Sequence, residues 1–206
     1  MQIKGITNIK YFTKGHRGIL YTGNYKKKKI VIKAKLPESM AEGRIENEGR
    51  WLKRLNKLKV GPKLIKATKD YFFYEYVKGE FFVDFVKKLE VNDKNKKLIL
   101  KLIKGCLEQC FILDSLKVDK EELHHPLKHI LITKQKKIVM LDFERCHIVE
   151  YPKNVTQFVV FLMRFSNFFA EHLVKIDKDR MIGLARLYKR YQTRENLRII
   201  IDSIDK

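Results

Sequence analysis

Apolar and polar residues alternate in short runs over the first third of the chain. Residues 1–36 contain three such runs, separated by a glycine turn and a lysine-rich turn, which predicts three antiparallel strands. Over residues 38–59 the apolar side chains recur at the spacing of one helix face, and Gly61-Pro62 ends that helix. Residues 63–67 and 71–77 return to short apolar runs and are predicted to be strands. This part of the sequence therefore predicts an antiparallel sheet with one helix.

After Gly79, which is the first candidate for a hinge, the pattern becomes mainly helical. Helices are predicted at residues 81–89, 94–116, 155–174, 179–191 and 194–204. One exception lies at residues 129–144, where an apolar triplet, a turn of polar and lysine residues and a second apolar run predict a β-hairpin. We therefore expect an α+β protein with a small sheet domain at residues 1–78 and a mainly helical domain at residues 79–206.

Composition changes the picture mainly through charge. The 206 residues carry 45 Lys+Arg against 24 Asp+Glu, a formal net charge of +21, and the lysines are spread along the chain. A broadly positive surface attracts polyanions, so RNA, ribonucleoprotein particles and nucleotides are candidate partners. A charged surface adapted to high temperature is the alternative explanation of the many lysines. The 45% of hydrophobic residues is enough for a real core, which excludes a disordered protein.

Other features of the sequence argue against several classes of protein. Cys106, Cys110 and Cys146 form neither a paired Cys-x-x-Cys motif nor a disulfide framework, and the first two are expected to be small core residues. The most apolar stretch, residues 155–170, contains Arg164 and is too short to span a bilayer, so we expect a buried helix and no membrane partner. The N-terminus lacks a basic leader followed by an apolar block, which favours a cytoplasmic protein.

Candidate metal ligands stand at the two ends of the predicted hairpin. His129 precedes its first strand and Asp142 follows its second, so both are expected to face one site. Imidazole favours transition metals over magnesium, so His129 suggests that Mn²⁺ could serve. His124 and His125 add two imidazoles nearby. Hydrogen bonds that cap the loop or the following segment are the structural alternative for these side chains.

The order of these features resembles the protein-kinase-like superfamily. A glycine turn is followed by a strand ending in Ile32-Lys33, a helix with an internal acid, a pair of strands, a hinge, a long helix, a polar loop and a hairpin that ends in Asp142. The resemblance covers roughly residues 10 to 165 and is greatest to the small atypical branches: the RIO kinases, the kinase subunit of the KEOPS tRNA-modification complex and the predicted archaeal serine/threonine kinases. It implies a bilobal protein-kinase-like fold, in which ATP and Mg²⁺ or Mn²⁺ lie between a small antiparallel sheet lobe with one helix and a reduced helical lobe.

This resemblance assigns two residues of the N-terminal domain to catalysis. Ile30-Val31-Ile32-Lys33 is similar to the third-strand lysine motif, so Lys33 is the candidate for the α- and β-phosphates of ATP, with Lys35 as its rival. Glu48 is similar to the glutamate of the helix that pairs with this lysine, and Glu46 is its competitor. The resemblance therefore predicts an ion pair between Lys33 and Glu48.

The same resemblance places the nucleotide and the metal. Gly15 and Gly18 correspond to the glycine-rich turn over the phosphates, and Glu75 is a further candidate for binding the nucleotide. Asp142, in the run Asp142-Phe143-Glu144, looks like the metal-binding acid of Asp-Phe-Gly, with glutamate in place of glycine. Loss of that glycine removes an easy backbone switch, which favours a fixed arrangement of the site.

Residues 119–129 take the place of the catalytic loop. Matching Glu122-Leu123 to the Asp-Leu of the family makes Glu122 the catalytic carboxylate and His129 the replacement for the metal-binding asparagine. An ungapped match places His124 at the position of the carboxylate instead. A carboxylate can accept or orient a hydroxyl proton, which favours Glu122.

Three functions follow from the resemblance and the charge. The leading hypothesis is an atypical ATP-dependent serine/threonine kinase with an unidentified protein acceptor, or an ATPase, because no long activation segment follows Glu144. The second is a pseudokinase whose basic surface docks on RNA or a ribonucleoprotein. A small-molecule phosphotransferase is the third hypothesis. An enzyme for cationic substrates is expected to carry an acidic pocket, whereas this chain is strongly basic.

Overall fold

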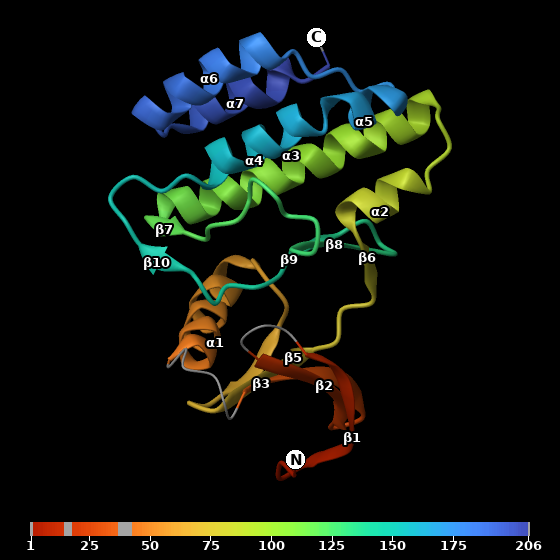
Figure 1. Cartoon of the computed structure of the whole chain (residues 1–206), viewed down its shortest axis with the longest axis vertical. Coiled ribbons are helices and arrows are strands. Elements are labelled where there is room, and N and C mark those ends of the chain that lie inside the picture. The colour runs from red at the N-terminus through yellow and green to blue at the C-terminus, as the bar shows by residue number, and fades with distance from the viewer. Residues whose placement is uncertain (1, 15–17, 37–42, 206) are drawn as a thin grey trace. The chain divides into compact units, whose positions relative to one another are not determined.

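The structure, a computed structural model of the chain, describes residues 2–14, 18–36 and 43–205 (Figure 1). Over these residues it is an α+β protein with a five-stranded antiparallel sheet near the N-terminus and seven α-helices. Two compact units are distinguished: the first unit is Met1–Lys78 with Val139–Cys146, and the second unit is Gly79–Ile138 with His147–Lys206. The sequence placed residues 139–146 in the C-terminal domain, whereas the structure groups them with the N-terminal sheet, because side chains of the first unit bind this segment.

The first unit is built on one antiparallel sheet. Its strands are β1 (Ile6–Lys14), β2 (Gly18–Tyr25), β3 (Lys28–Lys35), β4 (Leu64–Ala67) and β5 (Tyr71–Glu75), in the spatial order β1-β2-β3-β5-β4. These strands match the ones predicted from the sequence. Lys26 and Lys27 form the turn between β2 and β3, and their φ angles of 47° and 64° are those of a tight hairpin turn that follows the twist of the strands. Ile30 and Ile32 of the central strand β3 pack with Phe73 in the core of the sheet.

One helix packs on this sheet. α1 (Arg44–Leu55) and the 3-10 turn η1 (Asn56–Leu58) account for most of the helix predicted at residues 38–59, of which residues 38–42 lie outside the described part of the chain. Gly49 allows the helix to approach closely, because a Cβ atom added there would lie 2.8 Å from the Cβ atom of Ala67 in β4. The position of α1 against β4 and β5 therefore depends on a residue without a side chain.

The second unit is mainly helical. Its helices are α2 (Phe82–Lys87), α3 (Asp93–Ser115), α4 (Asn154–Arg164), α5 (Ser166–Glu171), α6 (Lys178–Arg190) and α7 (Arg194–Ser203). Figure 1 shows α3, α4, α6 and α7 lying side by side. The prediction of a single helix at residues 155–174 is wrong in extent, because the helix is interrupted at Phe165, between α4 and α5. Apolar residues continue on both sides of this break, so periodicity does not reveal it. None of the described helices combines the length and the apolar character needed to cross a membrane.

Phenylalanines of α4 and α5 contribute to the core of the second unit, in the stretch that the sequence predicts to be a buried helix. Phe158, Phe161 and Phe169 are fully buried, and the ring of Phe161 packs against the other two in tilted and edge-on pairs. Such pairs stabilise a core beyond the apolar area that they bury. Cys106 and Cys110 of α3 are fully buried free thiols, which confirms that they are core residues.

Short strands accompany these helices. β6 (Gly79–Phe81) pairs with β8 (Ile130–Thr133), and β7 (Val118–Asp119) pairs with β10 (His147–Ile148); β6, β7 and β10 were not predicted. β8 and β9 (Ile138–Met140) are the strands of the predicted hairpin. In the turn between them the backbone N–H of Thr133 donates a hydrogen bond to the carbonyl oxygen of Lys137, and the carbonyl oxygen of Thr133 accepts one from Lys136. β6 and β8 are too short to show a clear alternation of apolar and polar residues. Gly79 allows the two strands to approach closely, because an added Cβ atom would lie 2.7 Å from the Ile132 carbonyl oxygen.

A buried polar network joins α3, α4 and α6. Asp114, near the end of α3, accepts hydrogen bonds from the backbone and side-chain amides of Asn154 and from the hydroxyl of Tyr188. Burial raises the pKa of Asp114 above its ordinary value, while these donors favour the ionised carboxylate. Asn154 in turn accepts a hydrogen bond of 2.9 Å from the backbone N–H of Lys120. The network therefore also holds the start of the loop that follows β7.

Candidate active site

Lys33 of β3 lies at the centre of a charged group in the first unit. Its Nζ atom is 2.6 Å from Oε2 of Glu48, 3.2 Å from Oδ1 of Asp142 and 3.3 Å from Oε2 of Glu144. Only 14% of the Lys33 side chain is exposed. One ammonium group is thus surrounded by three carboxylates, one from α1 and two from the segment that follows β9.

Burial distinguishes Lys33 and Glu48 from their rivals in the sequence. Lys35 is exposed at the end of β3 and forms no ion pair within the described residues. Glu48 is 3% exposed, whereas Glu46 is only half-buried. Residues two positions apart on a helix do not share a face, and of these two glutamates Glu48 is the one paired with Lys33. The predicted ion pair is present, and its role in catalysis stays a prediction.

Two neighbouring residues of α1 hold the segment that carries Asp142. Oε2 of Glu48 accepts a hydrogen bond from Lys33. The other oxygen, Oε1, accepts a hydrogen bond of 3.2 Å from the backbone N–H of Phe143. The side-chain amide of Asn47 donates to the carbonyl oxygens of residues 144 and 146, at 3.0 and 3.1 Å. Glu48 therefore binds the lysine and the segment at the same time, which couples their positions.

Phe143 anchors the same segment through packing. Its side chain is fully buried, and a Cβ atom added at Gly61 would lie only 3.0 Å from the Phe143 ring. Asp142, the preceding residue, has a φ angle of 63°, in the left-handed region that few residues with a side chain adopt. Such strain persists where surrounding contacts impose it, and here the contacts of Phe143 and Asn47 do so.

Sequence reasoning missed Asn47 and Glu144. Glu144 was considered only as a replacement for glycine, although a carboxylate two residues after Asp142 is itself a candidate ligand. Asn47 precedes Glu48 on the helix, and its amide is a type of side chain that binds free carbonyl groups. Neither residue belongs to a motif of its own. Each could have been found from the sequence only because it lies next to, or two positions from, a candidate residue.

The carboxylates change the acid–base properties of the group. Burial by itself lowers the pKa of Lys33, but the negative charges of its three partners, Glu48 foremost, outweigh burial and leave this pKa above its ordinary value. Burial raises the pKa of Glu48, whereas the Lys33 ammonium and the Phe143 N–H favour its ionised form. Burial, followed by the charge of Glu48, also raises the pKa of Tyr74 in β5. Lys33 therefore stays protonated at neutral pH, and it can neutralise only one of the carboxylates.

The acidic side chains of this group have the chemistry of a site for a hard divalent cation. Oxygen atoms of Glu48, Asp142 and Glu144 lie within 4.8 Å of one another. Glu48 is the most buried of them and bonds to Lys33, while the side chains of Asp142 and Glu144 are 34% and 12% exposed. Carboxylate oxygens are preferred ligands of Mg²⁺ and Mn²⁺. The donor set therefore fits the cation that the resemblance implies.

Of the two glycines predicted to lie over the phosphates, the structure describes only Gly18. Gly15 lies outside the described residues. Gly18 begins β2, where an added Cβ atom would lie 3.1 Å from the Ala34 carbonyl oxygen and 3.6 Å from Cε of Lys33. A side chain at position 18 would thus approach the Ala34 carbonyl oxygen closely and only touch the stem of Lys33, so a glycine suits this position.

Glu75, the other predicted nucleotide contact, is a paired acid at the end of β5. It accepts a hydrogen bond of 2.8 Å from Lys28, and Lys63 lies 3.4 Å away. The hydrogen bond from Lys28 lowers the pKa of Glu75 below its ordinary value. The structure shows two lysine partners for Glu75, and its contact with a nucleotide stays a prediction.

Glu122 and His129 belong to the second unit. Oε2 of Glu122 lies 3.9 Å from Nε2 of His129, so the two loop residues chosen from the sequence are close together. Glu121 and Glu122 have φ angles of 62° and 57°, and consecutive left-handed residues of this kind are uncommon. His124, the rival of Glu122, is exposed. Asp142 belongs to the first unit, so the prediction that it faces one site with His129 stays a prediction.

The loop that carries Glu122 is held by α4. Asn154 accepts a hydrogen bond of 2.9 Å from the N–H of Lys120, and Gln157 accepts one of 2.9 Å from the N–H of Leu123. Both acceptors project from the first turns of the same helix. The backbone on either side of Glu122 is therefore fixed within the second unit.

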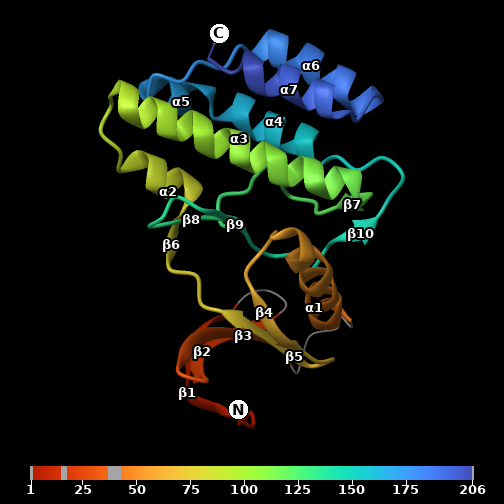
Figure 2. The ribbon, with the colours of Figure 1, turned by 180° about the vertical axis from the view of Figure 1, so that it is seen from behind.

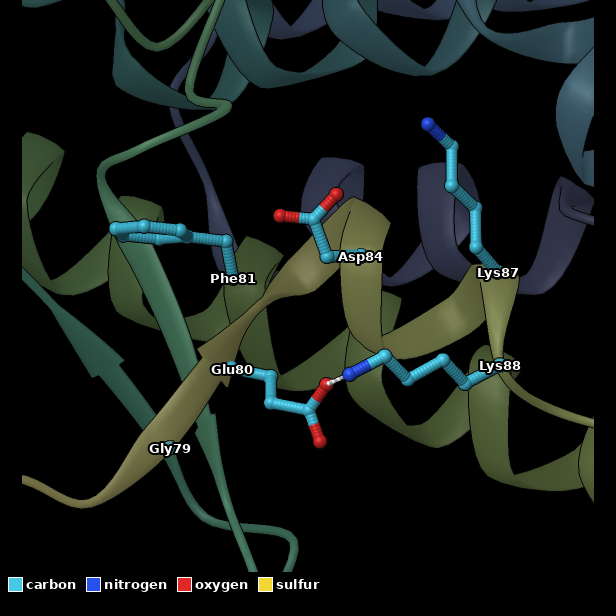
Figure 3. Close-up of a pocket in the computed structure, with 6 residues that line it drawn as sticks. All are labelled: Gly79, Glu80, Phe81, Asp84, Lys87 and Lys88. Atoms are coloured by element: carbon cyan, nitrogen blue, oxygen red, sulfur yellow. Dashed lines mark hydrogen bonds and ion pairs between the residues drawn. The ribbon is translucent and has the colours of Figure 1, made fainter.

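A surface pocket of the second unit is lined by other residues. It has a volume of about 380 Å³ in the second unit and is lined by Gly79, Glu80, Phe81, Asp84, Lys87 and Lys88 (Figure 3). Figure 3 shows Glu80 and Lys88 joined by an ion pair. None of the candidate catalytic, nucleotide-binding or metal-binding residues is among those that line this pocket.

No protein-family model and no curated protein sequence matches this chain. A functional assignment must therefore come from the side chains and from their geometry.

Proposed function

We propose that this protein binds ATP with Mg²⁺ or Mn²⁺ and transfers or hydrolyses the terminal phosphate, as an atypical, RIO-like kinase or an ATPase. The observation that carries the proposal is the ion pair between Lys33 and Glu48. A strand lysine held by a helix glutamate is the part of a protein kinase that positions the phosphates of ATP. The order of elements gives further support, since Glu48 lies on the helix between β3 and β4, as the resemblance predicts.

Each residue of the charged group has a task under this proposal. Lys33 binds phosphate oxygens with its ammonium group, and Glu48 keeps that ammonium group in place. Asp142 and Glu144 would hold the metal ion through their carboxylate oxygens. When bound, the ion would supply positive charge near the transferred phosphoryl group, and phosphoryl transfer is catalysed mainly by such positioning and charge stabilisation.

A rigid group suits this chemistry. Asp142 is held in a left-handed conformation by the buried ring of Phe143 and by two hydrogen bonds from Asn47. The arrangement therefore supports a site that is assembled before the nucleotide binds. The roles of Glu122 as the base for an acceptor hydroxyl, and of His129 as a further metal ligand, stay predictions.

Thermal unfolding with and without nucleotide tests the proposal. At 100 times its dissociation constant a ligand of the folded state contributes about 2.7 kcal/mol, so ATP with Mg²⁺ or Mn²⁺ should raise the melting temperature. Asp142→Asn should abolish the metal-dependent part of this rise. Asparagine tolerates the φ angle of 63° at this position, so the variant removes the charge without adding backbone strain.

Matched lysine variants make the test specific to the site. Lys33→Met should lose the rise with ATP, whereas Lys35→Met, on the same strand but exposed, should keep it. If the wild type shows no rise, or if Lys33→Met and Asp142→Asn both keep it, ATP does not bind at this group and the proposal fails.

Measurements of phosphate distinguish a kinase from an ATPase. With ATP labelled at the terminal phosphate, an ATPase releases labelled inorganic phosphate without an acceptor, while a kinase labels a protein on serine or threonine. Glu122→Gln should reduce either reaction and leave ATP binding intact, because a base acts on the attacking hydroxyl and not on the nucleotide. Unchanged turnover in this variant would remove Glu122 from the mechanism.

A further inference from the structure

A row of lysines runs along the exposed side of α3 in the second unit. Lys94, Lys97, Lys101 and Lys104 follow one another at intervals of three or four residues, so they project from one face of the helix over about 15 Å. All four side chains are exposed, and none forms an ion pair with another described residue. Figure 2 shows α3 along its whole length, in front of α4.

Three more lysines stand in the turn between β8 and β9. These exposed residues are Lys134, Lys136 and Lys137. Ile138, the first residue of β9, contacts α3, because its carbonyl oxygen accepts a hydrogen bond of 3.2 Å from the side chain of Gln109. The ammonium group of Lys136, within the turn, lies 4.2 Å from the centre of the Phe85 ring in α2. Gly105, one helical turn after Lys101, faces the Ile138 side chain so closely that an added Cβ atom would collide with it. We call the row on α3 and the lysines of this turn the lysine surface (Lys94, Lys97, Lys101, Lys104, Lys134, Lys136 and Lys137).

The lysine surface is mainly positive. Asp93 stands four residues before Lys97, and Glu108, four residues after Lys104, is paired with Arg194. None of the large apolar side chains that are exposed in the described residues lies on α3 or in the turn at residues 134–137. Stable protein interfaces depend on buried aromatic and apolar anchors, and amphipathic membrane helices need apolar residues that insert. Single-stranded nucleic acids are bound by aromatic side chains that stack on bases. A protein partner, a membrane and a single strand are therefore each a poor match.

We propose that the lysine surface binds the phosphate backbone of double-stranded RNA. Ammonium groups that lack acidic partners bind polyanions through release of the counterions condensed on the phosphates. The four-lysine face of α3 presents no arginine, asparagine or glutamine for reading base edges, as recognition of a DNA sequence in the major groove requires. Duplex RNA, in contrast, is recognised mainly through its shape and its phosphates.

This surface shares no residue with the proposed nucleotide site. Lys33 and its three carboxylate partners belong to the first unit, and the lysine surface belongs to the second. RNA binding can therefore be tested in the full chain without nucleotide, and its failure would leave the proposal for ATP unaffected.

The experiment measures binding of a fluorescent 20-base-pair RNA duplex to the full chain by anisotropy, in a series of salt concentrations. The test variant is Lys94→Gln/Lys97→Gln/Lys101→Gln/Lys104→Gln, since glutamine has nearly the helix propensity of lysine. The control variant changes four exposed lysines that lie elsewhere and removes the same charge: Lys53→Gln/Lys57→Gln/Lys175→Gln/Lys189→Gln. Unchanged melting temperatures confirm that both variants fold.

The expected loss follows from the number of phosphate contacts. Each lost contact should lower the slope of log affinity against log salt by about 0.9, which corresponds to roughly eightfold weaker binding at 0.1 M salt. The test variant should therefore bind the duplex roughly a thousandfold to ten-thousandfold more weakly at 0.1 M salt, with a slope reduced by about 3 to 4, while the control variant stays close to the wild type.

Several results would overturn the proposal. Equal losses in the test and control variants would mean that only the total charge matters. A DNA duplex of the same sequence that binds as tightly as the RNA would remove the assignment to RNA. Tighter binding of single-stranded RNA, of anionic vesicles or of an acidic peptide would assign the surface to a different partner.

Discussion

Removal of the Lys33 charge should destabilise the first unit strongly. Lys33→Met keeps the apolar stem and the volume of a side chain that is only 14% exposed, but it leaves three carboxylates without their common cation. Loss of one partner of a buried ion pair typically costs about 3 to 5 kcal/mol. Because Asp142 is partly exposed to water, we expect a loss at the low end, about 3 kcal/mol at pH 7. Lys35→Met, the exposed control, should change stability by less than about 0.5 kcal/mol.

The pH dependence of this loss has a definite sign. Burial raises the pKa of Glu48, and without Lys33 the main group that favours its carboxylate is gone. The folded variant then binds a proton more readily than the unfolded chain, in which a glutamate has a pKa of about 4.3. The stability of the variant therefore falls as the pH rises from the unfolded toward the folded pKa of Glu48. Its difference in stability from the wild type becomes smaller as the pH falls toward the unfolded pKa. We expect a larger difference from the wild type at pH 8 than at pH 5.

Urea unfolding measures these differences through a built-in probe. Trp51 is the only tryptophan of the chain and is a buried residue of α1, so its fluorescence follows the first unit. The double variant Lys33→Met/Glu48→Gln should recover much of the stability lost in Lys33→Met, because removing both members of a buried pair costs little. A Lys33→Met protein as stable as Lys35→Met, or one whose loss is the same at pH 5 and pH 8, would refute this reasoning.

Three further changes have expected outcomes. Phe143→Ala should destabilise the first unit by about 3 to 5 kcal/mol, because it empties a fully buried site, and a smaller loss in urea unfolding followed at Trp51 would contradict the anchoring role. Asn154→Ala should lower the stability of the second unit by about 1 to 3 kcal/mol, since it leaves buried hydrogen-bonding groups without a partner, and thermal unfolding followed by circular dichroism should detect this. Lys28→Met should raise the pKa of Glu75, which the hydrogen bond from Lys28 lowers, and an NMR titration showing no change would contradict that cause.

Local patterning was sufficient for most of the secondary structure. The five strands of the sheet and the long helices could be predicted because the buried side chains of each element repeat along its own length. Patterning failed at Phe165, where two helices meet within one apolar stretch, and at the two- and three-residue strands β6, β7 and β10. Strands of that length are too short for a period, and they exist only because a partner strand binds them.

The pair of Lys33 and Glu48 was predictable because a resemblance connects two residues that are only 15 positions apart. Burial then distinguished this pair from Lys35 and Glu46, which have the same chemistry but are more exposed. The roles of Glu122, His129 and Glu75 depend on a nucleotide and a metal, so they stay predictions.

Only the tertiary structure decided that three carboxylates share one ammonium group. Asp142 and Glu144 lie 109 and 111 residues after Lys33, and no local pattern encodes a contact across such a distance. The backbone groups of residues 143, 144 and 146 leave water in the folded state, so they must find partners, and Asn47 and Glu48 provide them. The sequence by itself therefore determined the elements and the first ion pair, whereas the pairing of buried polar groups with α1 determined which distant segment completes the site.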